Sequence, residues 1–193
     1  MANLISENDR LLDIVDNKDI IMGSRSRAEI HRLGLLHREI HVWMFDENRN
    51  IFFQKRGLPV SMSGLFDATA GGHINKGEDY LDAAIRETKE ETSITISPAD
   101  LIFLKKSMGT EYVSREDSLG TINNFIRSVY IYKYPIKEQT LRKEPGILGV
   151  NFKKFSYAFL QDISKRDSKM FIKFVLTDEL PSVLKYVNQW KKD

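Results

Sequence analysis

The sequence predicts a single domain, residues 1–193, of mixed α/β or α+β class. Runs rich in β-branched and aromatic residues are interspersed with segments of helical periodicity, the pattern of folds in which helices cover a sheet. The chain is long enough for one large core, and no repeat, low-complexity tract or linker divides it. With 41% hydrophobic and 29% charged residues, the composition is that of an ordinary globular protein.

The expected strands are bounded by turn-forming residues. Asp16-Asn17-Lys18 separates two short apolar runs, which predicts an N-terminal β-hairpin extension over about residues 1–36. The polar turn 46–50 separates a second pair of strands. In order, the expected strands are two runs within residues 11–23, then 37–45, 51–55, 101–105 and 126–134.

The expected helices carry their own start and stop signals. Pro98 lies soon after a helix over about residues 79–92, and Pro181 lies in the first turn of a C-terminal one. We expect the C-terminal region, about residues 155–193, to be helical, after a polar loop at 133–145. In order, the expected helices are 25–35 (a short helix or turn), 79–92, 155–163 and 180–190.

Charge and cysteine content exclude several classes of protein. The net charge is only +2, so we expect no nucleic-acid polymer as a partner. There is no cysteine, which excludes disulfides, thiol nucleophiles and thiolate metal sites. The chain has no apolar run long enough for a membrane span and no leader-like N-terminus, so we expect a cytoplasmic protein with no membrane contact.

Three carboxylates share one face of the helix expected at 79–92. At about 100° per residue, Glu90 and Glu91 fall about 60° and 40° to either side of Glu87. Magnesium prefers a few carboxylates, several waters and phosphate oxygens, so these acids suit one half of its coordination sphere. A solvated acidic face is the alternative. The core-facing side of this helix is expected at Leu81, Ile85 and Thr88.

The segment from Gly72 to Ile94 resembles the signature of the Nudix hydrolase family. That signature reads Gly, five residues, Glu, seven residues, Arg-Glu-aliphatic-any-Glu-Glu-any-Gly-aliphatic. Two positions depart from it, because Thr88 replaces an aliphatic residue and Ser93 replaces the second glycine. The matching positions are Gly72, Glu78, Arg86, Glu87, Glu90, Glu91 and Ile94.

The resemblance implies a fold, a cofactor and a set of roles. The fold would be an α/β/α sandwich around a mixed β-sheet. Glu87, Glu90 and Glu91 would bind Mg²⁺, with Mn²⁺ as an alternative, and Glu87, Glu90 and Arg86 would serve catalysis. Arg86 and Glu78 would pair to steady the loop–helix–loop, and Gly72 would let the backbone approach the phosphates.

The general base and the residues that contact the substrate are less defined. The base is left open among Glu87, Glu111, Glu116 and Glu144, because it differs among family members. Arg56 follows a strand and could meet an anionic substrate, although a solvated strand end explains it equally well. A small-molecule diphosphate is the expected partner, and a homodimer is considered as well.

A second resemblance, over about residues 25–95, is to the isopentenyl diphosphate isomerases, which share the Nudix fold. His31 and His37 lie near the two N-terminal histidines of those enzymes, and Gly71-Gly72-His73 stands in place of their Cys-Gly-His. Gly71 thus replaces the cysteine. The later acidic pair of the isomerases falls on Asn123 and Phe125.

The roles of His31, His37 and His73 are left open between a metal site and hydrogen-bonded structural residues. For the whole chain the leading hypothesis is magnesium-dependent hydrolysis of a diphosphate linkage in a nucleoside diphosphate-like compound. The alternatives are an isomerase-like enzyme, which the missing cysteine disfavours, and an inactive binding module with the same fold.

Overall fold

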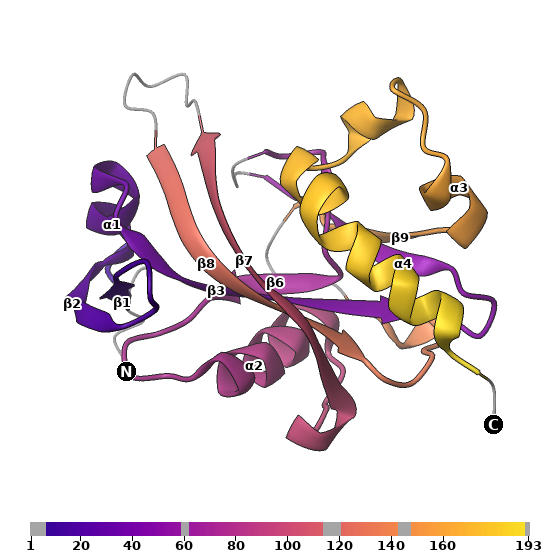
Figure 1. Ribbon diagram of the computed structural model, residues 1–193, viewed down its shortest axis with the longest axis horizontal. Coiled ribbons are helices and arrows are strands. Elements are labelled where there is room, and N and C mark those ends of the chain that lie inside the picture. Colours follow the sequence, from indigo (N-terminus) through magenta and orange to yellow (C-terminus); the bar gives the residue numbers. More distant parts are fainter. Residues whose placement is uncertain (1–6, 59–61, 114–120, 143–147, 192–193) are drawn as a thin grey trace.

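The computed structural model describes residues 7–58, 62–113, 121–142 and 148–191, and shows a large mixed sheet with helices on both sides (Figure 1). Helix α2 lies against one face, and α3 and α4 lie against the other (Figure 1). The mixed α+β class and the sandwich expected from the sequence are therefore confirmed. The described strands are β1 Leu11–Val15, β2 Ile21–Ser26, β3 Leu36–Phe45, β4 Ile51–Lys55, β5 Phe66–Asp67, β6 Ala70–His73, β7 Leu101–Val113, β8 Thr121–Tyr132 and β9 Asn151–Phe155.

Strand β3 is the centre of the sheet. It pairs antiparallel with β1, β4 and β6, and parallel with β8, while β2 extends β1 and β7 extends β8. Ile40, Val42 and Met44 pack on the side of α2, whereas Trp43 and Phe45 pack on the side of α4. Successive side chains of a strand point to opposite faces, so this near-continuous apolar run is what a strand covered on both sides requires.

The helices are α1 Arg27–Leu33, α2 Tyr80–Thr92, α3 Tyr157–Gln161 and α4 Leu180–Gln189. Short 3-10 turns occupy Pro98–Asp100, Glu138–Thr140 and Asp167–Met170, and a π-helical turn, Val175–Glu179, leads into α4. None of the helices in the described parts of the chain is long and apolar enough to cross a membrane.

Most expected elements are present, including the N-terminal hairpin β1–β2 and the pair β3–β4. Two expectations were wrong. Strands β7 and β8 are far longer than the expected 101–105 and 126–134, because their polar outer halves pair with each other. Strand β9 was missed, and its last residue, Phe155, had been assigned to the following helix. That the chain folds as one domain stays a prediction.

Helix α2 packs through its smallest residues. Ala83, Ala84 and Thr88 are fully buried, whereas Leu81 and Ile85, expected to form the core face, are only partly buried. Small side chains allow the helix to approach the glycines of β6 closely. The acidic side of the helix therefore faces the sheet more than the sequence pattern indicated.

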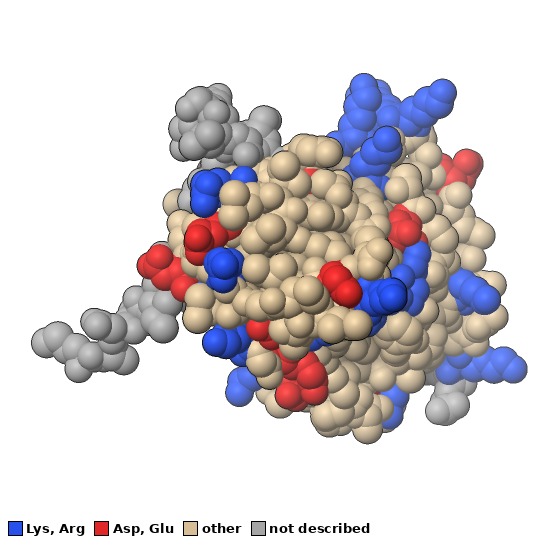
Figure 2. Space-filling view, turned by 60° about the vertical axis from the view of Figure 1, so that its left-hand side comes forward, with Lys and Arg blue, Asp and Glu red and all other residues tan. Residues whose placement is uncertain are grey.

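Charged side chains of both signs are mixed over the face shown in Figure 2, with a cluster of basic side chains at its upper edge. A broad central area of this face carries few charges.

Candidate active site

The helix that carries the three acids is fixed at both ends. At its start, the Asp79 carboxylate accepts hydrogen bonds of 2.8 Å from the backbone N–H groups of Leu81 and Asp82, the usual N-cap arrangement. At its end, Ser93 adopts the left-handed conformation, with φ of 62°, and its N–H donates to the Lys89 carbonyl. Ser93 thus makes the turn for which the signature has glycine, at a conformational cost of about 1 kcal/mol.

Arg86 ties this helix to the loop that precedes it. Its Nε and Nη2 donate to the two carboxylate oxygens of Glu78, both at 2.8 Å, and Nη2 also donates to the His73 carbonyl at 3.0 Å. Glu78 in turn accepts from the Asn75 N–H at 2.9 Å. The Arg86–Glu78 pair implied by the family resemblance is present, and its bidentate geometry holds the loop rigidly.

Glu87 is buried beside Gly72. Only 7% of the residue is exposed, and a Cβ built on Gly72 would lie less than 3.0 Å from the Glu87 carboxyl group. A side chain at position 72 would therefore have to displace the Glu87 carboxyl group. The approach of the Gly72 backbone to a phosphate, which the resemblance implied, stays a prediction.

The Glu87 carboxyl is poised between its charged and neutral forms. Burial raises its pKa from 4.5 to about 7, even though the Arg86 guanidinium, with Nη1 at 2.6 Å, and Arg10, with Nη2 at 3.4 Å, both favour the charged form. An acid whose pKa is near neutrality can take up and release a proton at physiological pH.

Glu90 and Glu91 complete the acidic group. The Glu90 side chain is 51% exposed, and its carboxylate lies 3.2 Å from Arg86 Nη1, the same nitrogen that contacts Glu87. The Glu91 carboxylate accepts from the Gly71 N–H at 2.9 Å and from Gln54 Nε2 at 3.3 Å. Glu87 and Glu90 both contact Arg86 Nη1, whereas Glu91 is bonded to β6, so the three acids offer oxygen donors of graded exposure along one helix. Among the described residues, the ligand atoms that converge within 4.8 Å belong to three histidines and not to these acids, so a magnesium site at the acids stays a prediction.

Arg56 directly follows strand β4, whose Gln54 contacts Glu91 of helix α2. Its Nη1 lies 2.6 Å from the Asp67 carboxylate. Burial opposes the charge of Arg56, but Asp67, with Glu111 and Glu91 in support, raises its pKa, so the guanidinium stays charged. Contact with an anionic substrate is thus open to Arg56 and stays a prediction.

Of the four candidates for the general base, two can be placed. Glu87 lies in the acidic group, and Glu111 lies on β7, where burial raises its pKa. Glu116 and Glu144 lie outside the described residues.

His31, His37 and His73 come together from α1, β3 and β6. One ring nitrogen of each lies within 4.8 Å of the others, and their ring centroids are 4.9 to 5.2 Å apart. The Nε2 atoms of His31 and His73 contact each other at 3.0 Å. His37 Nδ1 donates to the Leu35 carbonyl at 3.0 Å, and its buried Nε2 is then an acceptor with no hydrogen-bond partner among the residues that the structure describes.

Burial lowers the pKa of both His37 and His73, so these rings are neutral and can donate lone pairs. Mutual hydrogen bonding accounts for His31 and His73 as structural residues, whereas the unpartnered nitrogen of His37 favours a cation. The sequence left these two roles open, and the structure adds the proximity of the three rings.

A buried charge network beneath the site was missed from the sequence. Arg127 on β8 donates to Glu39 at 2.6 Å and to Glu179 at 2.9 Å, and Glu179 also accepts from His41 and from Trp43 Nε1. Burial opposes the charge on Glu39, but Arg127 and His73 hold the pKa of Glu39 well below its usual range. The sequence signal was a charged residue in an otherwise apolar central strand, which requires a buried partner.

These features define a class of protein. A glycine-bounded loop, an arginine–glutamate clamp and a helix with three inward or half-exposed carboxylates sit on a mixed sheet covered on both faces. A family model of the NUDIX domain matches residues 35–174 of this chain. The chain therefore belongs to the Nudix family.

Curated relatives agree with this assignment. A Nudix hydrolase of Clostridium acetobutylicum is 34% identical over 143 residues, which cover 70% of this chain and 66% of the relative. One of Streptomyces coelicolor is 37% identical over 92 residues, covering 47% and 51%. An isopentenyl-diphosphate Δ-isomerase of Serratia proteamaculans is 37% identical over 84 residues, covering 43% and 47%. The matched regions span about half to two thirds of the length of these relatives.

Solved structures share the fold. A crystal structure of a Deinococcus radiodurans protein gives a TM-score of 0.61 at 17% identity and covers 91% of this chain and 97% of that one. A MutT protein from Methanosarcina mazei gives 0.53 at 14% identity, covering 81% and 96%.

Proposed function

We propose that this protein hydrolyses a phosphoric anhydride bond, in a nucleoside diphosphate-like small molecule, with Mg²⁺ (or Mn²⁺) as cofactor. The observation that carries the proposal is the arrangement of Glu87, Glu90 and Glu91 on a helix clamped by Arg86 and Glu78. A bound magnesium ion would polarise phosphoryl oxygens and lower the pKa of a water.

We assign a different role to each of these residues. Glu90, which is half-exposed, and Glu91, whose carboxylate faces β6, would supply oxygen ligands to the metal. Arg86 does not contact the substrate in this scheme but orients the acids and the loop. Glu87, whose pKa is about 7, accepts the proton from the attacking water and is the base that we favour.

The isomerase alternative is disfavoured on steric grounds as well as by composition. A Cβ on Gly71 would lie less than 3.0 Å from the His41 ring, so a cysteine here would require His41 to move. His41 is held by Glu179 at 2.9 Å. The chain therefore has no residue for the proton-transferring thiol, and a side chain at position 71 would require the His41 ring to shift. An inactive binding module is disfavoured because all three acids are intact.

The test is a magnesium-dependent assay over a panel of diphosphate compounds, in ¹⁸O-labelled water. We expect the label on one phosphate-bearing product, and loss of turnover in Glu90→Gln with an unchanged unfolding curve. Glu138→Gln, at a half-exposed acid whose carboxylate pairs with Lys154, is the matched control and should retain activity.

Retained turnover in Glu90→Gln would overturn the assignment of that acid. Incubation with isopentenyl diphosphate should leave its double bond in place, and conversion to dimethylallyl diphosphate would overturn the hydrolase proposal. No turnover over a broad panel would favour the binding module. The cytoplasmic location, the absence of membrane and nucleic-acid contacts, and a homodimer rest on the sequence and remain predictions.

A further inference from the structure

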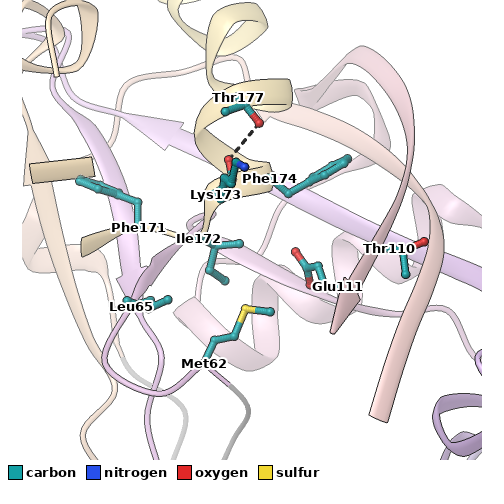
Figure 3. Close-up of a pocket in the computed structure, with 9 residues that line it drawn as sticks. All are labelled: Met62, Leu65, Thr110, Glu111, Phe171, Ile172, Lys173, Phe174 and Thr177. Carbon is teal, nitrogen blue, oxygen red and sulfur yellow. Dashed lines mark hydrogen bonds between the residues drawn. The ribbon is translucent and has the colours of Figure 1, made fainter. Parts of the chain in front are cut away.

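A cavity of about 430 Å³ lies between β7 and the segment that leads into α4 (Figure 3). One side is apolar and partly aromatic, formed by Met62, Leu65, Ile172 and Phe174. Glu111 points into the cavity from β7 on the opposite side (Figure 3). Its volume lies within the range of about 300–1,000 Å³ that is usual for small-molecule sites.

Strands β4 and β5 contact both the wall of this cavity and the helix that carries the acids. The Ile172 N–H donates to the Phe66 carbonyl of β5 at 3.0 Å, and Asp67 of β5 holds Arg56 at 2.6 Å. On β4, Gln54 donates to Glu91 at 3.3 Å. Arg56 also interacts electrostatically with both Glu91 and Glu111. These contacts link the acidic helix to the wall of the cavity through β4 and β5, with Arg56 interacting with an acid at each end.

The fold does not provide the hydrogen bonds that the Glu111 carboxyl group in this cavity would need. Its Oε1 is buried and has no hydrogen-bond partner among the described residues, and its Oε2 has only Asn123 Nδ2 at 3.5 Å. The surrounding charges oppose one another, because Arg127 and His41 favour the charged form of Glu111 while Glu39 and Asp67 disfavour it. They therefore do not replace the missing hydrogen-bond donor. A buried acceptor without a donor is unfavourable unless a ligand supplies one.

One class of ligand would satisfy both sides of the cavity. Phe174 and the apolar side chains beside it offer a surface for a flat ring, and Glu111 offers an acceptor for an N–H group. A nitrogen heterocycle satisfies both. A prenyl chain satisfies the apolar side alone and would leave the Glu111 oxygen buried and unpaired.

We propose that Glu111 is a specificity-determining residue, which accepts a hydrogen bond from an N–H group of a heterocyclic base bound in this cavity. The inference rests on the proposed function, whose diphosphate bond would be joined to that base. It assigns Glu111 to substrate recognition and not to the general-base role that the sequence left open for it.

The experiment compares kcat/KM for GDP and CDP with that for geranyl diphosphate, in the wild type, Glu111→Gln and Glu111→Leu. We expect Glu111→Leu to lower kcat/KM for the nucleoside diphosphates by about 10- to 100-fold, and to leave or raise that for geranyl diphosphate. Tyr112→Phe, an exposed neighbour on the same strand, is the control and should change neither.

Equal losses on all substrates, together with a changed pH profile, would make Glu111 a base and overturn the proposal. A preference of the wild type for geranyl diphosphate would also overturn it. Calorimetric binding of GMP without metal separates the two proposals. Binding that weakens in Glu111→Leu supports this inference even if no substrate is hydrolysed, whereas hydrolysis without any dependence on Glu111 leaves the hydrolase proposal standing and overturns this one.

Discussion

Replacing Glu87 by glutamine should abolish activity and yet stabilise the protein at alkaline pH. The Glu87 carboxylate is buried next to Gly72, and its pKa rises from 4.5 to about 7 despite two nearby guanidinium groups. A rise of that size corresponds to about 3 kcal/mol of unfavourable interaction with the charged form. The charged form of Glu87 is therefore unfavourable in the folded state, which is common among residues of active sites.

The direction in which stability changes with pH follows from proton linkage. Because the folded pKa lies above the unfolded one, the folded state binds the proton more tightly, and stability falls as pH rises from about 4.5 to about 7. Glu87→Gln removes this loss. We expect its free energy of unfolding to exceed that of the wild type by up to about 3 kcal/mol at pH 8, and to match it within about 1 kcal/mol at pH 4.5.

The assay is urea unfolding of both proteins, without metal, at pH 4.5, 6 and 8. Glu90→Gln is the control, because this acid is half-exposed and its replacement should change stability by less than about 1 kcal/mol at every pH. If Glu87→Gln were destabilised equally at all three values of pH, the buried charge would be a net stabilising contact and the argument would fail.

Four further predictions follow from the same geometry. Gly72→Val should lower activity more than stability, because its side chain would displace the buried Glu87 carboxyl group, and full activity would show that the glycine serves only the turn. Ser93→Gly should raise the free energy of unfolding by about 0.5–1 kcal/mol, measured in urea, since glycine adopts the left-handed turn without strain; a loss of stability would contradict this. The pKa of both Glu39 and Glu179 is lowered in the folded state, so the stability that they contribute should be lost as pH falls below about 4.5, and a flat acid profile would refute it. Titration of the wild type with Co²⁺, followed by absorption spectroscopy, should show a bound ion with nitrogen ligands from His31, His37 and His73. Equally tight binding of Co²⁺ by His37→Ala would exclude this histidine site.

Local sequence determined the central motif of this protein. The ion pair of Glu78 and Arg86 was implied by the resemblance of the Gly72–Ile94 segment to the Nudix signature, and both residues lie in one short loop–helix segment. The helix that carries Glu87, Glu90 and Glu91 was found from its periodicity and its end signals. The two hairpins were found from the turn residues between their apolar runs.

Only the tertiary structure decided what surrounds that motif. The length of β7 and β8 depends on their pairing with each other, which side-chain periodicity within one strand does not encode. The close contact between Gly72 and the Glu87 carboxyl comes from the packing of α2 on β6. The network around Arg127 joins strands and a helical turn that are far apart in sequence. Glu111 was one of several acids in the sequence, and its place in a largely apolar cavity, with a buried carboxyl oxygen, distinguishes it from the others. Burial and long-range pairing depend on contacts between distant segments, and these physical terms are absent from any local window of sequence.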